Sequence, residues 1–277
     1  MKIVMLGDVM GEGGLKALEK LPSFIAQNQP DFIIANGENA ANGFGITEET
    51  LKRMLACGID IITSGNHVWE KREFWPVLDS EKRIIRPANY PEGPGRGWIK
   101  IFREIRGSVR VFLVINLQGR ELMNSIDCPF RCFDSIEKAQ SEIKTENIIT
   151  PENIPADSNA KTFTIVDFHA ESTREKEAFG FYVDGRAAIT AGTHTHVKTA
   201  DEKIMPNGTA YISDLGMTGV NDSVIGIDPK ICIDRARNQV LYRMEEAAAG
   251  SGVCVQGIMC VIDDESGKAV SIERVNI

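Results

Sequence analysis

The chain has 277 residues, of which 43% are hydrophobic and 25% are charged, as in an ordinary soluble protein with a large core. Its 31 basic and 39 acidic residues give a net charge of −8, which argues against a protein that coats DNA or RNA through a basic face. The longest apolar stretch, residues 109–117, contains Arg110 and Asn116 and is too short to span a bilayer. We therefore expect a single domain over residues 1–277 that does not associate with a membrane.

The start of the sequence and the cysteines indicate a cytoplasmic protein. The first apolar run is too short for a signal peptide and meets Asp8 at once. The six cysteines are widely spaced and mostly have apolar neighbours, which is typical of buried thiols. Cys128 and Cys132 have a spacing that zinc ligands use, but no second pair of Cys or His follows them.

The first part of the chain alternates between strand-like and helix-like patterns. Thr47 precedes two acidic residues, as a helix N-cap does, and Gly58 ends the same helix. In chain order the patterns predict a strand at 2–7, a helix at 14–28, a strand at 32–35, a helix from 48 to about 57, a strand at 59–63 and a helix through 69–78.

Strands predominate after residue 83, and a helix and a hairpin follow near the end. The predicted elements are strands at 84–85, 98–102 and 109–117, a helix at 133–144, strands at 162–167, 187–191 and 210–213, a helix at 229–248 and a hairpin of 253–263 with 269–275. Asp228 and Pro229 suit the start of that last helix. Many strands with helices at both ends of the chain predict an α/β fold in which two mixed sheets pack between helical layers.

All four histidines lie in short polar motifs that end apolar, strand-like runs. The motifs of this kind are Gly7-Asp8, Gly37-Glu38-Asn39, Gly65-Asn66-His67, Asp167-Phe168-His169 and Gly192-Thr193-His194-Thr195-His196. Each motif alone is explained by a turn, a helix cap or a loop carboxylate. Together they predict one metal site, because carboxyl ends of strands converge at one sheet edge and imidazole is the commonest metal ligand.

The candidate ligands are too many for a single zinc ion. They comprise carboxylates (Asp8, Glu38), amides (Asn39, Asn66) and imidazoles (His169, His194, His196). This mixture of oxygen and nitrogen without thiolate favours two divalent ions, iron or manganese first, with zinc, cobalt or magnesium left open. Two metals about 3.5–4 Å apart catalyse in-line displacement at phosphorus.

These motifs resemble blocks of the calcineurin-like metallophosphoesterases. Gly65-Asn66-His67, the Gly192 to His196 block and the early aspartate Asp8 match that superfamily. The sequence departs from it at Asp8-Val9-Met10, where the superfamily has Asp-x-His, and at Gly37-Glu38-Asn39, where it has Gly-Asp. Both departures are similar to the YmdB-like branch, a bacterial group of 2′,3′-cyclic-nucleotide phosphodiesterases, and the resemblance extends over nearly the whole chain.

The resemblance implies a four-layer α/β/β/α sandwich and a role for each site residue. The implied ligands of the first metal are Asp8, Glu38, Asn39 and His196, and Glu38 bridges to a second metal held by Asn66, His169 and His194. His67 is the implied general acid. The implied reaction is hydrolysis of a small phosphodiester such as 2′,3′-cyclic AMP, in which a metal-bridging hydroxide attacks phosphorus and the leaving ribose oxygen takes a proton.

Other functions stay open at this point. A phosphomonoesterase or nucleotidase could use the same site, with Arg72, Arg86 or Arg96 binding the dianionic phosphate of a monoester. A regulatory protein could hold the metals as structural ions, with phosphodiesterase activity secondary, and a homo-oligomer is compatible with either. A dinucleotide-binding loop at Gly11-Glu12-Gly13-Gly14 is disfavoured, because Lys16 stands where that motif needs Gly or Ala.

Overall fold

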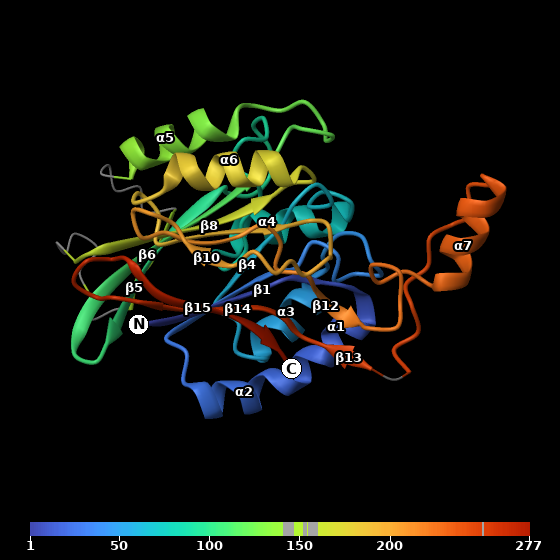
Figure 1. Cartoon of the computed structure of the whole chain (residues 1–277), viewed down its shortest axis with the longest axis horizontal. Coiled ribbons are helices and arrows are strands. Elements are labelled where there is room, and N and C mark those ends of the chain that lie inside the picture. Colours follow the sequence, from blue (N-terminus) through green and yellow to red (C-terminus); the bar gives the residue numbers. More distant parts are fainter. Residues whose placement is uncertain (141–146, 152–153, 155–159, 251) are drawn as a thin grey trace.

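The computed structural model describes residues 1–140, 147–151, 154, 160–250 and 252–277, and within them two large mixed sheets stack face to face (Figure 1). The first sheet has the order β15 (Ala269–Asn276), β14 (Gln256–Ile262), β1 (Lys2–Leu6), β3 (Phe32–Asn36), β4 (Ile61–Thr63). The second has the order β10 (Lys203–Ile204), β11 (Ala210–Ile212), β9 (Ile189–Thr193), β8 (Thr162–His169), β6 (Ser108–Gln118), β5 (Trp98–Ile105), β7 (Ile148–Ile149). A small sheet joins β13 (Val253–Cys254), β12 (Met217–Val220) and β2 (Asp8–Val9).

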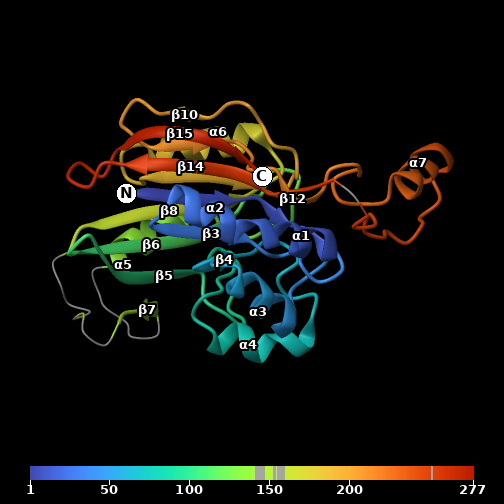
Figure 2. The ribbon, with the colours of Figure 1, turned by 90° about the horizontal axis from the view of Figure 1, so that it is seen from below.

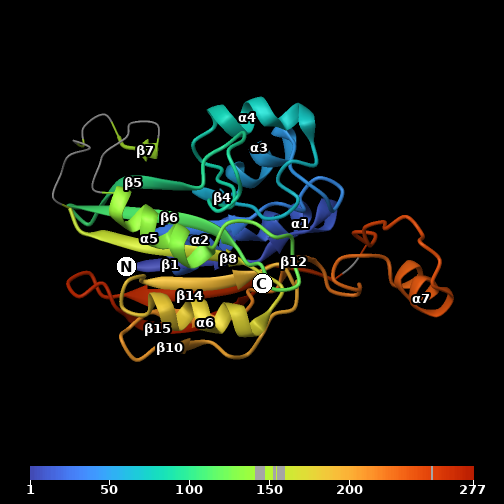
Figure 3. The ribbon, with the colours of Figure 1, turned by 90° about the horizontal axis from the view of Figure 1, so that it is seen from above.

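Helices cover the outer faces of both large sheets. On the first sheet lie α1 (Gly11–Ala17), the 3₁₀ helix η1 (Leu18–Lys20), α2 (Leu21–Asn28), α3 (Glu48–Ala56), the 3₁₀ helix η2 (Arg72–Phe74) and α4 (Trp75–Ser80). On the second lie α5 (Pro129–Ala139) and α6 (Thr173–Val183). Figures 2 and 3 show these two helical layers from opposite sides, and α7 (Pro229–Asn238) projects away from both.

Alternation along the strands builds the core. In β1, Ile3 and Met5 face the cluster between the sheets, whereas Val4 and Leu6 face the helices. Phe32 of β3 stacks on a ring of the other sheet, at a centroid distance of 4.3 Å from Phe112. The predicted α/β/β/α sandwich is therefore confirmed, with two apolar helix–sheet interfaces around a central sheet–sheet interface.

Some predicted helices have different limits. The helix expected at 14–28 is broken into α1, η1 and α2, with Pro22 in the first turn of α2. The helix expected at 229–248 is wrong beyond Asn238, because Gln239 adopts a left-handed conformation (φ 57°) that ends α7. The C-terminal end of the helix predicted at 133–144 lies outside the described residues. The structure also contains α6, which the sequence patterns did not predict.

Parallel pairing brings the strand ends together. β1, β3 and β4 run parallel as neighbours in one sheet, and β8 and β9 do so in the other. The carboxyl ends of both sets reach the same end of the molecule, where ligands bind in open α/β sheets. No helix of the described residues is long and apolar enough to cross a membrane.

Candidate active site

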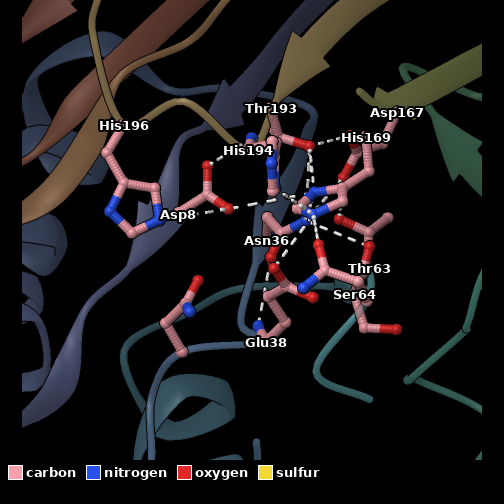
Figure 4. A network of polar contacts seen from close by, with 12 residues as sticks. Asp8, Asn36, Glu38, Thr63, Ser64, Asp167, His169, Thr193, His194 and His196 are labelled. Carbon is pink, nitrogen blue, oxygen red and sulfur yellow. Dashed lines mark hydrogen bonds and ion pairs between the residues drawn. The ribbon is translucent and has the colours of Figure 1, made fainter. Parts of the chain in front are cut away.

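The histidine side of the site is formed where β8 and β9 end beside the loops after β3 and β4. His169 Nε2 lies 2.9 Å from Glu38 Oε1, 3.0 Å from Asn66 Oδ1 and 3.1 Å from His194 Nδ1. Ligand atoms of Glu38, His169 and His194 lie within 4.8 Å of one another (Figure 4). Four side chains from four segments therefore turn their donor atoms toward one point.

The other side of the site contains Asp8, Asn39 and His196. In Figure 4, Asp8 lies between His196 and His169; its Oδ1 is 3.9 Å from His196 Nε2 and 4.0 Å from His169 Nδ1. Among the described residues, the buried oxygens Asp8 Oδ1 and Asn39 Oδ1 have no hydrogen-bond partner. Since an unpaired buried acceptor costs about 1–3 kcal/mol, these orphaned oxygens fit a cation that would accept their lone pairs.

In each of His169, His194 and His196, the ring nitrogen that faces away from the site lies against a hydrogen-bond acceptor. His169 Nδ1 lies 2.9 Å from Thr193 Oγ1, His194 Nε2 lies 3.1 Å from Glu171 Oε2, and His196 Nδ1 lies 2.9 Å from the Ile225 carbonyl oxygen. A donor role for these nitrogens leaves a lone pair on His169 Nε2, His194 Nδ1 and His196 Nε2, the nitrogens that face the site. Metal-binding histidines have this arrangement.

A buried polar network stands behind His169. Thr193 Oγ1 donates to Asp167 Oδ1 at 2.7 Å, and Asn36 Nδ2 donates to Asp167 Oδ2 at 3.1 Å. Thr63 donates to the same Asp167 oxygen. The sequence reasoning assigned no role to these residues, although Asp167 and His169 are two apart on β8 and share a face, and Thr193 pairs with His169 in register.

A cavity of about 580 Å³ opens beside these ligands and is lined by His67, the proposed acid. The His67 N–H donates to Glu38 Oε2 at 2.9 Å, which ties the His67 loop to the site. Arg72, Arg86 and Arg96 are not among the residues that line this cavity, whereas Arg235 of α7, which the sequence reasoning missed, does line it. Arg86 instead donates to the carbonyl oxygens of residues 87, 93 and 94.

Comparison with known proteins identifies the family of this chain. The sequence model of the YmdB-like protein family matches residues 4–275. This chain belongs to the YmdB-like family. The 2′,3′-cyclic-nucleotide 2′-phosphodiesterase of Bacillus subtilis (strain 168) is 40% identical, in an alignment covering 100% of this chain and 97% of that protein.

Solved structures support the same assignment. A novel phosphatase of Mycoplasma pneumoniae has a TM-score of 0.84 at 29% identity, covering 100% of this chain and 93% of that one. A hypothetical protein of Thermus thermophilus has a TM-score of 0.83 at 34% identity, covering 100% and 99% respectively. The YmdB-like chain therefore shares its sandwich fold with a phosphatase over the whole of its length.

Burial and charge shift the acidity of groups in this YmdB-like site. Burial raises the pKa of Asp8 to about 6, and burial followed by the neighbouring His169 charge lowers the pKa of His194 to about 3. Burial alone would raise the pKa of Glu38, but His169 outweighs it and lowers that pKa, while Glu38 in turn raises the pKa of His169. The lowered pKa favours the neutral imidazole of His194, the form that binds metals.

The loop that carries His194 and His196 has an unusual backbone conformation, which buried hydrogen bonds stabilise. His194 and His196 have positive φ angles of 101° and 61°, which non-glycine residues rarely adopt. Between them, the Thr195 N–H and Oγ1–H donate to Asp214 Oδ2 at 3.1 and 2.8 Å. Lys176 Nζ donates to the same oxygen at 2.8 Å, and both charged side chains are only 2% exposed. The ion pair of Lys176 with Asp214 thus holds the loop in the conformation that points both imidazoles toward the site.

Proposed function

We propose that this YmdB-like protein is a metal-dependent phosphodiesterase that hydrolyses 2′,3′-cyclic nucleotides. The observation that carries the proposal is the agreement among His169, His194 and His196. Each has one ring nitrogen toward the cluster of candidate ligands and the other against an acceptor, and the orphaned oxygens of Asp8 and Asn39 lie in the same cluster. The name of the 40% identical relative supports the substrate class. The cavity beside the ligands offers room for a small substrate.

The proposed ligands form two sets that share Glu38. The first set is Asp8, Glu38, Asn39 and His196, and the second is Glu38, Asn66, His169 and His194. The oxygen and nitrogen donors suit iron or manganese. Two such cations would lower the pKa of water and stabilise negative charge on the phosphoryl oxygens.

The protein's own residues position the substrate and move the proton. A water oxygen forms a bond to phosphorus, the bond from phosphorus to the ribose 2′ oxygen breaks, and the departing oxygen takes a proton to give a nucleoside 3′-phosphate. We assign that proton to His67. Its Nδ1 lies 3.4 Å from Glu70 Oε1, which leaves Nε2 as the nitrogen for the cavity. General acid catalysis of this kind contributes about 10²–10⁴-fold.

The test is hydrolysis of 2′,3′-cyclic AMP by protein stripped of metal and reloaded with manganese or iron(II). We expect turnover only after reloading, and its loss in Glu38→Gln. Glu104→Gln, at an exposed glutamate of β5 outside the cavity, is the matched control and should behave as wild type. Faster hydrolysis of adenosine 3′-phosphate than of the cyclic diester would instead indicate a phosphomonoesterase, and no turnover of either would refute the proposal.

A further inference from the structure

Three exposed apolar side chains are among the residues that line the cavity beside the candidate metal site. These are Phe44, Val197 and Ile225, which remain 36%, 56% and 48% exposed. We call these three side chains the apolar wall. Phe44 also contacts His67 edge to face, at a centroid distance of 5.0 Å. Phe44 thus lies directly beside the residue to which we assign the transfer of a proton to the ribose oxygen.

The turn that presents Ile225 is tight and strained. Val224 and Ile227 exchange backbone hydrogen bonds of 2.9 and 3.0 Å, and the two residues between them, Ile225 and Gly226, have φ angles of 51° and 92°. Two positive φ angles are the requirement of a type I′ turn, in which Asn-Gly is strongly preferred. A β-branched residue at the first position costs conformational energy, and such strain marks functional sites.

The same turn is fixed to the candidate metal site. The Ile225 carbonyl oxygen lies 2.9 Å from His196 Nδ1, so the position of the isoleucine is set by a proposed metal ligand. Two of the polar residues that line the cavity already have partners: Thr195 Oγ1 donates to Asp214, and Glu171 pairs with His194. The wall therefore offers contact area for a flat apolar surface at a fixed distance from the metals.

We propose that the apolar wall binds the nucleobase of the substrate and so gives the enzyme a preference for nucleoside 2′,3′-cyclic phosphates over the same reacting group without a base. This inference rests on the proposed function and adds a specificity site to it. The phosphate at the metals and the base on the wall are the two ends of one nucleotide, with the ribose beside His67. Because the wall recognises area rather than hydrogen-bonding edges, it accepts every base and favours the larger purines over pyrimidines.

The decisive substitution is Ile225→Asn. Asparagine suits the positive φ at this position, so the turn is retained or strengthened while the apolar side chain is lost. Phe44→Ala removes the other large element of the wall. Phe181→Ala is the matched control, because Phe181 is a 57% exposed phenylalanine on α6 outside the cavity.

The substrates compared are 2′,3′-cyclic AMP and ribose 2,3-cyclic phosphate, which has the same reacting group without a base. Stacking of one base leads us to expect a kcat/KM at least about ten-fold higher for the nucleotide in wild type. Ile225→Asn and Phe44→Ala should abolish most of this preference, because KM should rise much more for the nucleotide than for the base-free substrate. Equal kcat/KM for both substrates in wild type, or an equal loss on both in the variants, would overturn the proposal.

Binding measured without turnover separates this inference from the proposed function. Calorimetry would compare adenosine 3′-phosphate with ribose 3-phosphate on the manganese-loaded protein. We expect the adenosine compound to bind more tightly, and this difference to be lost in Ile225→Asn and kept in Phe181→Ala. That result would support base binding at the apolar wall even if neither cyclic substrate were hydrolysed. Equal binding of the two compounds overturns it.

Discussion

The His169 and His196 sides of the site are held by different kinds of structure. The His169 side chain is 0% exposed, and its outer nitrogen contacts Thr193 within a network that continues to Asp167. The His196 side chain is 10% exposed, and its outer nitrogen contacts the backbone of the turn at Ile225. One side is therefore positioned by the interior of the protein, and the other by a surface turn.

The difference separates two requirements of such an enzyme. A buried polar network is rigid only when every member is satisfied, so it fixes a ligand but tolerates little change. A turn at the surface can vary its side chains while its backbone carbonyl keeps the same contact. We infer that the His169 side maintains the chemistry of the site, whereas the His196 side adapts the site to its substrate.

The largest loss of bound metal and of activity is expected for His169→Ala. This change removes a proposed ligand and leaves Glu38 buried without its imidazole partner. Bound metal, measured by elemental analysis of reloaded protein, should fall by one ion per chain, and kcat/KM for 2′,3′-cyclic AMP should fall by more than the ~10–100-fold that outer contacts contribute. Two ions per chain in the variant would contradict the ligand assignment.

A large loss of stability is expected for Lys176→Met. The substitution leaves Asp214 as an unpaired buried charge under the loop that carries His194 and His196. Removal of one partner of a buried ion pair costs about 3–5 kcal/mol, which urea unfolding of the metal-free protein would measure.

The control for this prediction is an exposed ion pair. Lys52→Met breaks the contact of Lys52 with Glu48, whose side chains are 71% and 58% exposed. Its loss should be about 0.3–0.5 kcal/mol. Similar losses for Lys176→Met and Lys52→Met would mean that the buried pair does not hold the loop.

The features of the fold and site that could be predicted from the sequence are those that depend on local patterns of residues. Alternating apolar residues such as Ile3 and Met5 revealed the long strands, and polar residues at strand ends revealed every proposed ligand. The strand predicted at 84–85 is wrong, because Ile84 forms only an isolated bridge, and the short strands β2, β7, β10 and β12 were not predicted. The fold class followed, because the order of these elements fits few layered arrangements. The family membership agrees with that prediction, and the roles of the individual site residues stay proposals.

What the sequence did not reveal depends on contacts between distant segments. Helix α6 escaped prediction because Glu175 and Lys176, which are buried, interrupt its apolar pattern. Glu175 accepts hydrogen bonds from the Arg120 and Glu121 N–H groups, and Lys176 pairs with Asp214. No local rule predicts that such charges face inward, since their partners lie 38 to 55 residues away in the chain.

A smaller effect, on metal affinity, is expected for Thr193→Val. Valine keeps the shape of threonine but leaves His169 Nδ1 without its hydroxyl partner. Loss of such an outer contact costs about 10–100-fold in metal affinity, which competition with a chelator would measure. Thr218→Val is the control, because the buried Thr218 hydroxyl has no partner among the described residues. An equal loss in both variants would show that the Thr193 contact contributes nothing specific.

The smallest loss of metal affinity is expected for Glu171→Gln. Glu171 is the outer partner of His194, but its side chain is 46% exposed, so water shares that contact. Glutamine retains an acceptor oxygen for His194 Nε2 and loses only the charge. Metal affinity, measured by the same chelator competition, should therefore fall by less than the ~10-fold lower limit for outer contacts.

Thr193→Val and Glu171→Gln together test the distinction between interior and surface support. If Glu171→Gln weakened metal binding as much as Thr193→Val, solvent exposure would not decide how firmly an outer partner holds its histidine. The smaller effect that we expect follows because water can replace a carboxylate at the surface, whereas nothing replaces the Thr193 hydroxyl behind the fully buried His169.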